Sequence, residues 1–320
     1  MKHYFTYCLV ILLLASCKKE ELPVAKHNPG DVLTYAVNLE SNYKWQYFYN
    51  LETNSIISKN LKTIWDLGFE SSAAGFHIIL NNSKAMYAWN KGVQSFASIS
   101  DTTGFFHNKQ WDDPSGDLTQ TAIGDWRNNN ATYIIDRGYN EDGTALGFRK
   151  IQFQQVDDKK YKVRIANLDG TGDVTLQLIK DSTYNFQFLS FQTNSLLIVE
   201  PPKSTWDLCF TQYTHVFYSP LMTYLVTGCL LNRYQTTAAA DSIQTFNAIT
   251  YDNSKSAVYS NHINTIGYDW KTFSGNTYTT HPEKNYLIKN SKGFTYKLHF
   301  IDYYNAQGVK GNPKWEFQKL

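Results

Sequence analysis

One eight-residue motif, which we call the WDL word, occurs in two similar copies in this chain of 320 residues, as KTIWDLGF from Lys62 and as KSTWDLCF from Lys203. Each copy alternates large apolar residues as a buried β-strand requires, yet each places an aspartate, which strands disfavour, between Trp and Leu. Because local propensity does not account for that aspartate, we infer that it has the same structural role in both copies. The repeated word therefore predicts two copies of one β-rich unit.

Further matches follow in the same order in both halves of the chain. The words IGDW and IGYDW come after the two WDL words, and TYIID and NYLIK come after those. Ordered matches at a long spacing are typical of an internal repeat. We therefore predict a tandem duplication, with one unit over residues 42–181 and the other over residues 182–320.

Composition favours strands over helices. The chain contains 23 Tyr, 19 Phe and 8 Trp, and no extended helical periodicity follows the N-terminal segment. Turn pairs such as Asp142-Gly143 and Lys292-Gly293 separate alternating runs, as β-hairpins require. The predicted fold class is all-β with antiparallel sheets. A net charge of +2 provides no basic surface for nucleic acid.

The N-terminus, MKHYFTYCLVILLLASCKKEE, has the layout of an export signal. A short basic start, an apolar run too short to span a bilayer and several small residues lead directly to Cys17. LLASC resembles a bacterial lipobox, which implies that residues 1–16 are a signal peptide and that Cys17 carries acyl chains such as palmitate. Several acyl chains on one residue would anchor the protein firmly in a membrane. The alternative is an ordinary cleaved signal with an incidental cysteine.

The residues after Cys17 bear on location. Lys18 and Lys19 followed by two glutamates resemble the export tag of surface lipoproteins in Bacteroidota, which implies an outer-membrane protein that faces outward. Residues 17–41 lack a sustained period and contain two prolines, so we predict a tether that merges into a first strand near Val32.

The repeated words contain residues to which we assign structural roles. In TWDLCF, strict alternation would place Trp206, Leu208 and Phe210 on one strand face and Asp207 on the other. We interpret Asp66 and Asp207 as acceptors for backbone N–H groups at a strand end, and not as catalytic groups. The tryptophans of the repeated words are predicted core residues: Trp65, Trp126, Trp206 and Trp270.

Two cysteines follow Cys17, namely Cys209 and Cys229. A hairpin turning near Ser219-Pro220 would place them almost opposite each other, and an exported protein permits a disulfide. A register shift of one residue would turn one of them to the other face. We favour two buried free thiols, with the disulfide as the alternative.

Catalytic motifs are missing from the sequence. It contains no G-x-S-x-G elbow, H-E-x-x-H, phosphate loop, C-x-x-C or dinucleotide fingerprint. The segment NLDGTGD lacks the closing Glu of a calcium loop and reads as a hairpin turn. We therefore predict a protein that is not an enzyme.

A resemblance adds to these predictions. The WDL strand with its long hairpin, then IGYDWKTF, then YKLHFIDYYNAQGVKGNPKWEFQ, all behind a lipobox, resemble the HmuY family of haem-binding lipoproteins. Residues 182–320 carry the resemblance most clearly, and residues 42–181 are a fainter copy. The resemblance implies an all-β fold and capture of haem or a related tetrapyrrole for delivery to an outer-membrane receptor.

The resemblance also suggests ligands for the haem iron, which takes His, Met, Cys or Tyr side chains. His281 lies near the position where the family places one ligand, and His262 is the candidate for the other, although neither matches the family's register. Both histidines lie in segments that read as loops, where side chains reach ligands readily. The alternative is that the fold was kept while the ligand changed, which would give a non-catalytic binding or structural subunit for a protein or glycan partner.

Overall fold

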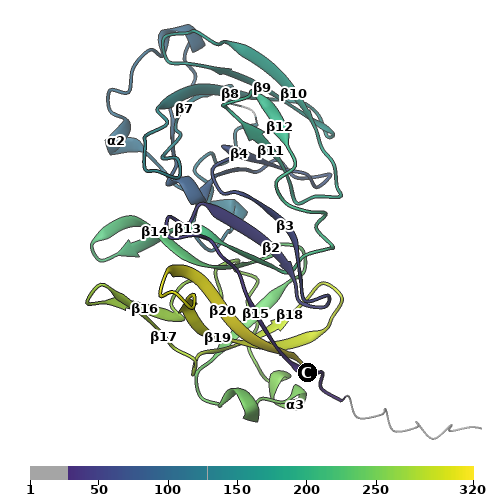
Figure 1. The fold of residues 1–320 in the computed structure, drawn as a ribbon. Coiled ribbons are helices and arrows are strands. Elements are labelled where there is room, and N and C mark those ends of the chain that lie inside the picture. The colour runs from purple at the N-terminus through teal and green to yellow at the C-terminus, as the bar shows by residue number, and fades with distance from the viewer. Residues whose placement is uncertain (1–27, 128) are drawn as a thin grey trace, which may run out of the picture.

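The computed structural model describes residues 28–127 and 129–320, and this part of the chain is nearly all β-strand (Figure 1). Cys17, the signal peptide and most of the predicted tether lie outside the described residues. No helix in the described part is long and apolar enough to cross a bilayer. The helical elements are short: η2 (Asn82–Lys84), η3 (Phe96–Ser98), α2 (Phe105–Asn108), η4 (Leu118–Gln120), η5 (Phe246–Ala248) and α3 (Tyr251–Ser254).

The strands form two lobes, and every strand pair is antiparallel, which confirms the predicted fold class. The first lobe contains a five-stranded sheet in the order β10-β9-β8-β7-β6 and a four-stranded sheet in the order β12-β11-β4-β5. Its strands are β4 (Leu67–Glu70), β5 (Ile78–Leu80), β6 (Tyr87–Asn90), β7 (Thr132–Asp136), β8 (Phe148–Asp157), β9 (Lys160–Ala166), β10 (Val174–Ile179), β11 (Phe186–Ser190) and β12 (Ser195–Leu197).

The second lobe repeats this plan and adds one hairpin. It has a five-stranded sheet in the order β1-β20-β19-β18-β15, a four-stranded sheet in the order β14-β13-β2-β3, and the pair β16-β17. Its strands are β1 (Val32–Ala36), β2 (Trp45–Asn50), β3 (Ser55–Leu61), β13 (Leu208–Tyr218), β14 (Leu221–Leu231), β15 (Thr237–Asp241), β16 (Lys271–Ser274), β17 (Thr277–Thr280), β18 (Asn285–Lys289), β19 (Thr295–Tyr304) and β20 (Lys310–Lys319).

The two halves of the sequence are interleaved in these lobes. Strand β2, from the first half, pairs with β13, with Tyr49 opposite Leu208, and strand β11, from the second half, pairs with β4, with Leu189 opposite Leu67. The core of the first lobe is accordingly drawn from residues 67–191, and that of the second from residues 37–51 and 208–317. Each half contributes a hairpin to the lobe of the other half. The predicted duplication into units 42–181 and 182–320 remains a prediction about the origin of the chain.

The two WDL aspartates hold the exchanged hairpins. Asp207 Oδ2 accepts a hydrogen bond from the backbone N–H of Leu51 at 2.8 Å, and Asp66 Oδ2 accepts one from that of Phe191 at 2.7 Å. Each N–H belongs to the residue just after β2 or β11, which would otherwise lose its partner as the strand ends. Both aspartates thus accept hydrogen bonds from backbone N–H groups, as the structural role assigned to them requires.

The surroundings of the two carboxylates differ. Asp66 also contacts the Lys84 ammonium at 2.5 Å and Arg137 Nε at 3.2 Å, and all three side chains are buried. Asp207 has no such pair among the described residues, and burial raises its pKa to about 6. Asp66 is therefore the anion of a buried ion network, whereas Asp207 is an almost isolated acceptor.

The prediction that Trp206 shares a strand face with Leu208 and Phe210 is wrong. Strand β13 begins at Leu208, so Trp206 precedes the alternation and does not share a face with Leu208 and Phe210. Its indole packs edge-on against Phe48 between the lobes, with ring centroids 4.9 Å apart. Leu208 and Phe210 instead lie in the core of the second lobe. All the tryptophans predicted as core residues are buried: Trp65, Trp126, Trp206 and Trp270.

The cysteine prediction is confirmed. In the β13–β14 hairpin, Cys209 lies opposite Leu230, and Cys229 lies opposite Phe210. This offset of one residue turns the two thiols to opposite faces of the sheet. Both cysteines are buried and free.

A further buried carboxyl, Glu200, lies where the lobes meet. Its Oε1 accepts hydrogen bonds from the backbone N–H groups of Asn185 at 2.6 Å and Phe186 at 2.9 Å. Burial raises the pKa of Glu200 from 4.5 to about 7, although these hydrogen bonds and the nearby Arg233 oppose the shift. Between pH 4.5 and 7 the folded protein therefore keeps a proton on Glu200 that the unfolded chain has already released.

The first prediction compares the two aspartates. Asp66→Ala should lower the free energy of unfolding by about 3–5 kcal/mol, because it leaves a buried lysine and arginine without their anion. Asp207→Ala should cost about 1–3 kcal/mol, because it leaves one buried N–H unpaired. Chemical denaturation measures both losses. Asp125→Ala, which removes an exposed pair with Arg127, is the control and should change stability by less than about 1 kcal/mol. Equal losses at Asp66 and Asp207 would contradict the assigned difference.

The second prediction concerns pH. Because the folded-state pKa of Glu200 is raised, its favourable contribution is complete below pH 4.5 and is lost as the pH rises through about 7. The free energy of unfolding of the wild-type protein should therefore fall by on the order of 3 kcal/mol over this interval relative to that of Glu200→Gln. This variant keeps an acceptor oxygen but does not titrate. Denaturation of both proteins from pH 4.5 to 8 measures the difference, in which other carboxyls cancel. Parallel stability curves would refute the shift.

Candidate functional site

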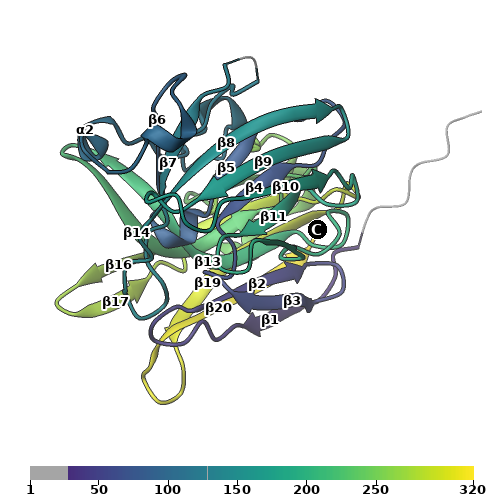
Figure 2. The same ribbon diagram turned by 90° about the horizontal axis from the view of Figure 1, so that it is seen from above.

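Two hairpins of the second lobe, β13–β14 and β16–β17, project on the same side of the molecule (Figures 1 and 2). Their outer parts carry large apolar side chains that remain exposed: Tyr218 at 71%, Leu221 at 62%, Met222 at 47%, Tyr224 at 59% and Phe273 at 58%. Exposed apolar residues gathered in one place typically mark an interaction site. The hairpins are therefore the first candidate for the functional site.

Strand pairing defines the face of β13–β14 that concerns us. Directly opposed residues of an antiparallel pair share a face, and the register places His215 opposite Tyr224 and Phe217 opposite Met222. The His215 ring lies 4.8 Å from the ring of Phe217 and 4.8 Å from that of Tyr268. We call the four paired residues the hairpin face: His215, Phe217, Met222 and Tyr224.

The other face of this hairpin is attached to the first lobe. Thr214 Oγ1 donates a hydrogen bond to the carbonyl oxygen of Asn82 at 2.8 Å, and the hydroxyls of Thr223 and Tyr87 lie 2.5 Å apart. These contacts hold the hairpin against the first lobe through its threonines. The hairpin face is therefore presented on a supported element.

His215 is the unusual residue of the hairpin face. Its Nδ1 is buried and has no hydrogen-bond partner among the described residues. Burial lowers the pKa of His215, so the imidazole is neutral at neutral pH and keeps a lone pair for a metal. His, Met and Tyr are all ligands that haem iron accepts, and the hairpin face contains all three. The donors and the aromatic rings present here fit a haem in kind.

The histidines predicted as ligands lie elsewhere. His262 is exposed in the loop between β15 and β16, and the backbone N–H of the next residue, Ile263, donates to the carbonyl oxygen of Ser115 in the first lobe at 2.8 Å. His281 follows β17, where its Nε2 lies 2.6 Å from Thr272 Oγ1 and its Nδ1 lies 3.3 Å from a Glu283 oxygen. The two histidines have different neighbours, and their ligation of iron remains a prediction.

Two further histidines are occupied by internal contacts. His77 Nδ1 lies 2.6 Å from a Glu70 carboxylate oxygen. His299 stacks on Phe246 with ring centroids 4.2 Å apart, and its Nδ1 lies 2.7 Å from the carbonyl oxygen of Pro282. Among the described residues, no group of three or more His, Cys, Asp and Glu side chains is arranged to hold a metal ion. His215 thus differs from both because its buried Nδ1 has no partner.

Sequence reasoning missed His215 because its strand, LCFTQYTHVFY, alternates like an ordinary sheet strand. The available signal was the turn that follows, where Tyr218, Leu221, Met222 and Tyr224 place apolar residues at a hairpin tip. Hairpin tips normally carry polar residues, since they face water. Apolar residues at that position indicate a surface that something else covers.

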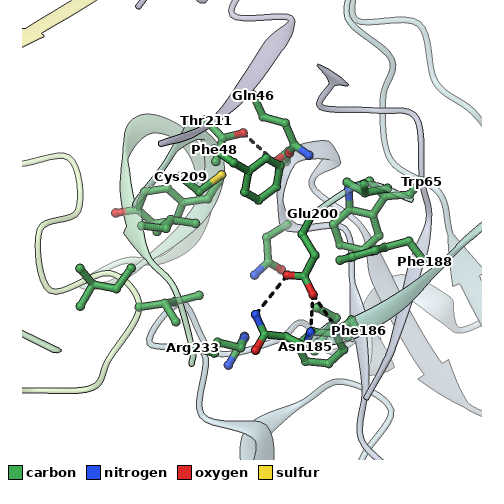
Figure 3. A pocket seen from close by; sticks show the side chains of 18 of the residues that line it. Gln46, Phe48, Trp65, Asn185, Phe186, Phe188, Glu200, Cys209, Thr211 and Arg233 are labelled. Carbon is green, nitrogen blue, oxygen red and sulfur yellow. Dashed lines mark hydrogen bonds between the residues drawn. The ribbon is translucent and has the colours of Figure 1, made fainter. Parts of the chain in front are cut away.

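A cavity between the two four-stranded sheets is the second candidate (Figure 3). It has a free volume of about 120 Å³ and is lined by both lobes. Pockets for drug-sized ligands enclose about 300–1,000 Å³, so a tetrapyrrole does not fit inside. Its aromatic lining consists of Phe48, Trp65, Phe186, Phe188, Trp206 and Tyr213.

The chain is similar to several solved structures, among them an HmuY analog and an HmuY-like protein. The Tannerella forsythia apo HmuY analog TFO is 10% identical, with 92% of this chain and 98% of that chain covered and a TM-score of 0.33. Apo PinO from Porphyromonas gingivitis is 8% identical, with coverage of 91% and 97% and a TM-score of 0.30. A protein of Bacteroides vulgatus described as a "putative HmuY_like heme binding protein" is 10% identical, with coverage of 89% and 90% and a TM-score of 0.23.

Comparison by sequence gives a more direct result. A search of curated proteins found no match. The family model described as "HmuY protein" matches residues 42–317, which include every strand from β2 to β19 and most of β20. Because the match covers most of the chain, this protein belongs to the HmuY family.

Proposed function

We propose that this protein is a surface lipoprotein, anchored through Cys17, that captures haem or a related tetrapyrrole on the hairpin face and delivers it to an outer-membrane receptor. The observation that carries the proposal is His215, a neutral histidine with an unpartnered buried nitrogen that shares the hairpin face with Met222 and two aromatic side chains. Membership of the HmuY family and the description of the Bacteroides vulgatus relative support a haem-type ligand. They also favour binding over catalysis.

The residues of the hairpin face would have different roles in binding haem. Haem would supply an iron with axial positions that His215 and Met222 suit by type. Phe217, Tyr224 and the nearby Tyr268 would cover apolar parts of the ring, which removes that surface from water. His262 and His281 remain the alternative ligand pair implied by the family resemblance.

A second function deserves a test because the hairpin tip is apolar on both faces. Tyr218 and Leu221 oppose each other on the face away from His215, and both are more than half exposed. A protein or glycan partner that binds without haem could cover them. This alternative predicts a stable complex and no spectral change with haemin.

The third prediction separates the two ligand pairs. Titration of the protein with haemin should produce a new Soret band, and Met222→Leu and His215→Gln should each weaken binding about tenfold or more, because each removes a metal donor. His262→Ala and His281→Ala should leave the spectrum unchanged. His77→Ala, which alters a histidine paired with Glu70 in the first lobe, is the matched control.

The contrary outcomes of this titration are distinct. Spectra that change only in the His262 and His281 variants would transfer the site to the pair implied by the resemblance. Haemin binding with unaltered spectra in all four variants would remove every named ligand. A wild-type protein without a Soret band would refute haem capture and leave the alternative partner.

The fourth prediction concerns the anchor. Cys17→Ser should prevent lipidation and leave the protein out of the membrane fraction, because the acyl chains supply the membrane affinity. Fractionation followed by immunoblotting measures this. Normal processing with retention in the membrane would contradict the anchor. Protease treatment of whole cells tests outward orientation separately, since an inward-facing lipoprotein would be protected.

A further inference from the structure

The cavity between the lobes is built from corresponding parts of the two halves. Trp206 packs edge-on against Phe48 at 4.9 Å, and Trp65 packs edge-on against Phe188 at 4.7 Å. In each pair the tryptophan comes from a WDL word and the phenylalanine from the hairpin that the other half contributes. The two aromatic pairs therefore line one shared interior space.

Both indoles leave a polar group unpaired. Trp65 Nε1 and Trp206 Nε1 are buried and have no hydrogen-bond partner among the described residues. A buried indole N–H normally finds an acceptor, and one left unpaired costs about 1–3 kcal/mol. By contrast, Trp126 Nε1 donates to the carbonyl oxygen of Phe76 at 2.8 Å. Figure 3 shows the nitrogen of Trp65 on the side of its ring that faces the pocket. Two tryptophans that line the cavity thus carry indole N–H groups without acceptors.

Charge and size restrict what could enter. The carboxyl of Glu200 already lines the cavity, and the guanidinium of Arg233, which also lines it, interacts with both Glu200 and Asp112. An anion that entered would leave water for a site whose lining cation, Arg233, already faces the carboxyls of Asp112 and Glu200, which the low dielectric of the interior disfavours. The free volume of about 120 Å³ is close to that of an engineered cavity of about 150 Å³ that holds benzene. The occupant is therefore small and uncharged.

We propose that this cavity binds a neutral molecule about the size of a benzene ring, whose oxygen accepts hydrogen bonds from the indole N–H groups of Trp65 and Trp206. Small cyclic ketones and similar carbonyl compounds have this chemistry. The site is separate from the hairpin face, so the inference does not depend on haem capture. The apolar rings around the ligand lower the local dielectric constant, which strengthens the hydrogen bonds to its oxygen.

The test uses the full-length protein with ¹⁵N-labelled tryptophan and two probes of similar size, cyclohexanone and toluene. Cyclohexanone should shift the indole N–H resonances of Trp65 and Trp206 saturably, whereas toluene, which lacks an acceptor, should bind more weakly. Trp65→Phe and Trp206→Phe should each weaken cyclohexanone binding about 3- to 10-fold, as the loss of one hydrogen bond predicts, and should leave toluene binding unchanged. Trp126→Phe is the matched control and should have no effect, because its N–H is already paired.

A second variant guards against loss of folding in the tryptophan mutants. Cys209 lines the cavity, so Cys209→Met should fill the space and abolish binding of both probes while the variant keeps a cooperative unfolding transition in chemical denaturation. Absence of saturable shifts at both indoles, as expected for a cavity holding only water, would overturn the proposal. Equal weakening of both probes by the phenylalanine variants would also overturn it, since the N–H groups would then not select the ligand.

Discussion

A buried carboxylate that accepts a hydrogen bond from the end of an exchanged strand holds this molecule together. Asp207 binds the N–H of Leu51, and Asp66 binds that of Phe191, across sequence separations of 156 and 125 residues. Each contact ties a hairpin from one half of the chain into the sheet of the other half, so neither half of the chain forms a complete four-stranded sheet on its own. The seam between the lobes, with its cavity and its aromatic pairs, exists because of this exchange.

Much of this architecture was predictable from local patterns. Asp66 and Asp207 were identified as backbone acceptors because strands disfavour aspartate, and the thiols of Cys209 and Cys229 were expected to be free. The exchange of hairpins was not predictable, because pairing within one half and pairing between halves present the same residues to the same kind of neighbour. The face of Trp206 was mispredicted for a related reason: periodicity shows how residues alternate but not at which residue a strand begins.

The site was harder to predict than the fold. His215 alternates with apolar neighbours like any strand residue, and only the register shows that Met222 and Tyr224 join it on one face. The halves also differ in the length of one strand. In the first half the WDL word leads into β4, which ends at Glu70, whereas in the second half it leads into β13, which continues to Tyr218. Only the longer copy extends into a projecting hairpin, so the first lobe supports the site without providing a second one.

The two candidate sites differ in how a ligand would leave them. On the hairpin face, Met222 and Tyr224 are about half exposed, so a bound molecule could pass to a partner without movement of the core. The cavity between the lobes is lined by Phe48, Trp65 and Trp206, each less than one tenth exposed, so a ligand there would be held mainly by packed rings. Close-packed side chains resist displacement, because every displaced ring loses contacts on several sides. The exposed face therefore suits a ligand that is handed on, and the cavity suits one that stays with the fold and stabilises the seam.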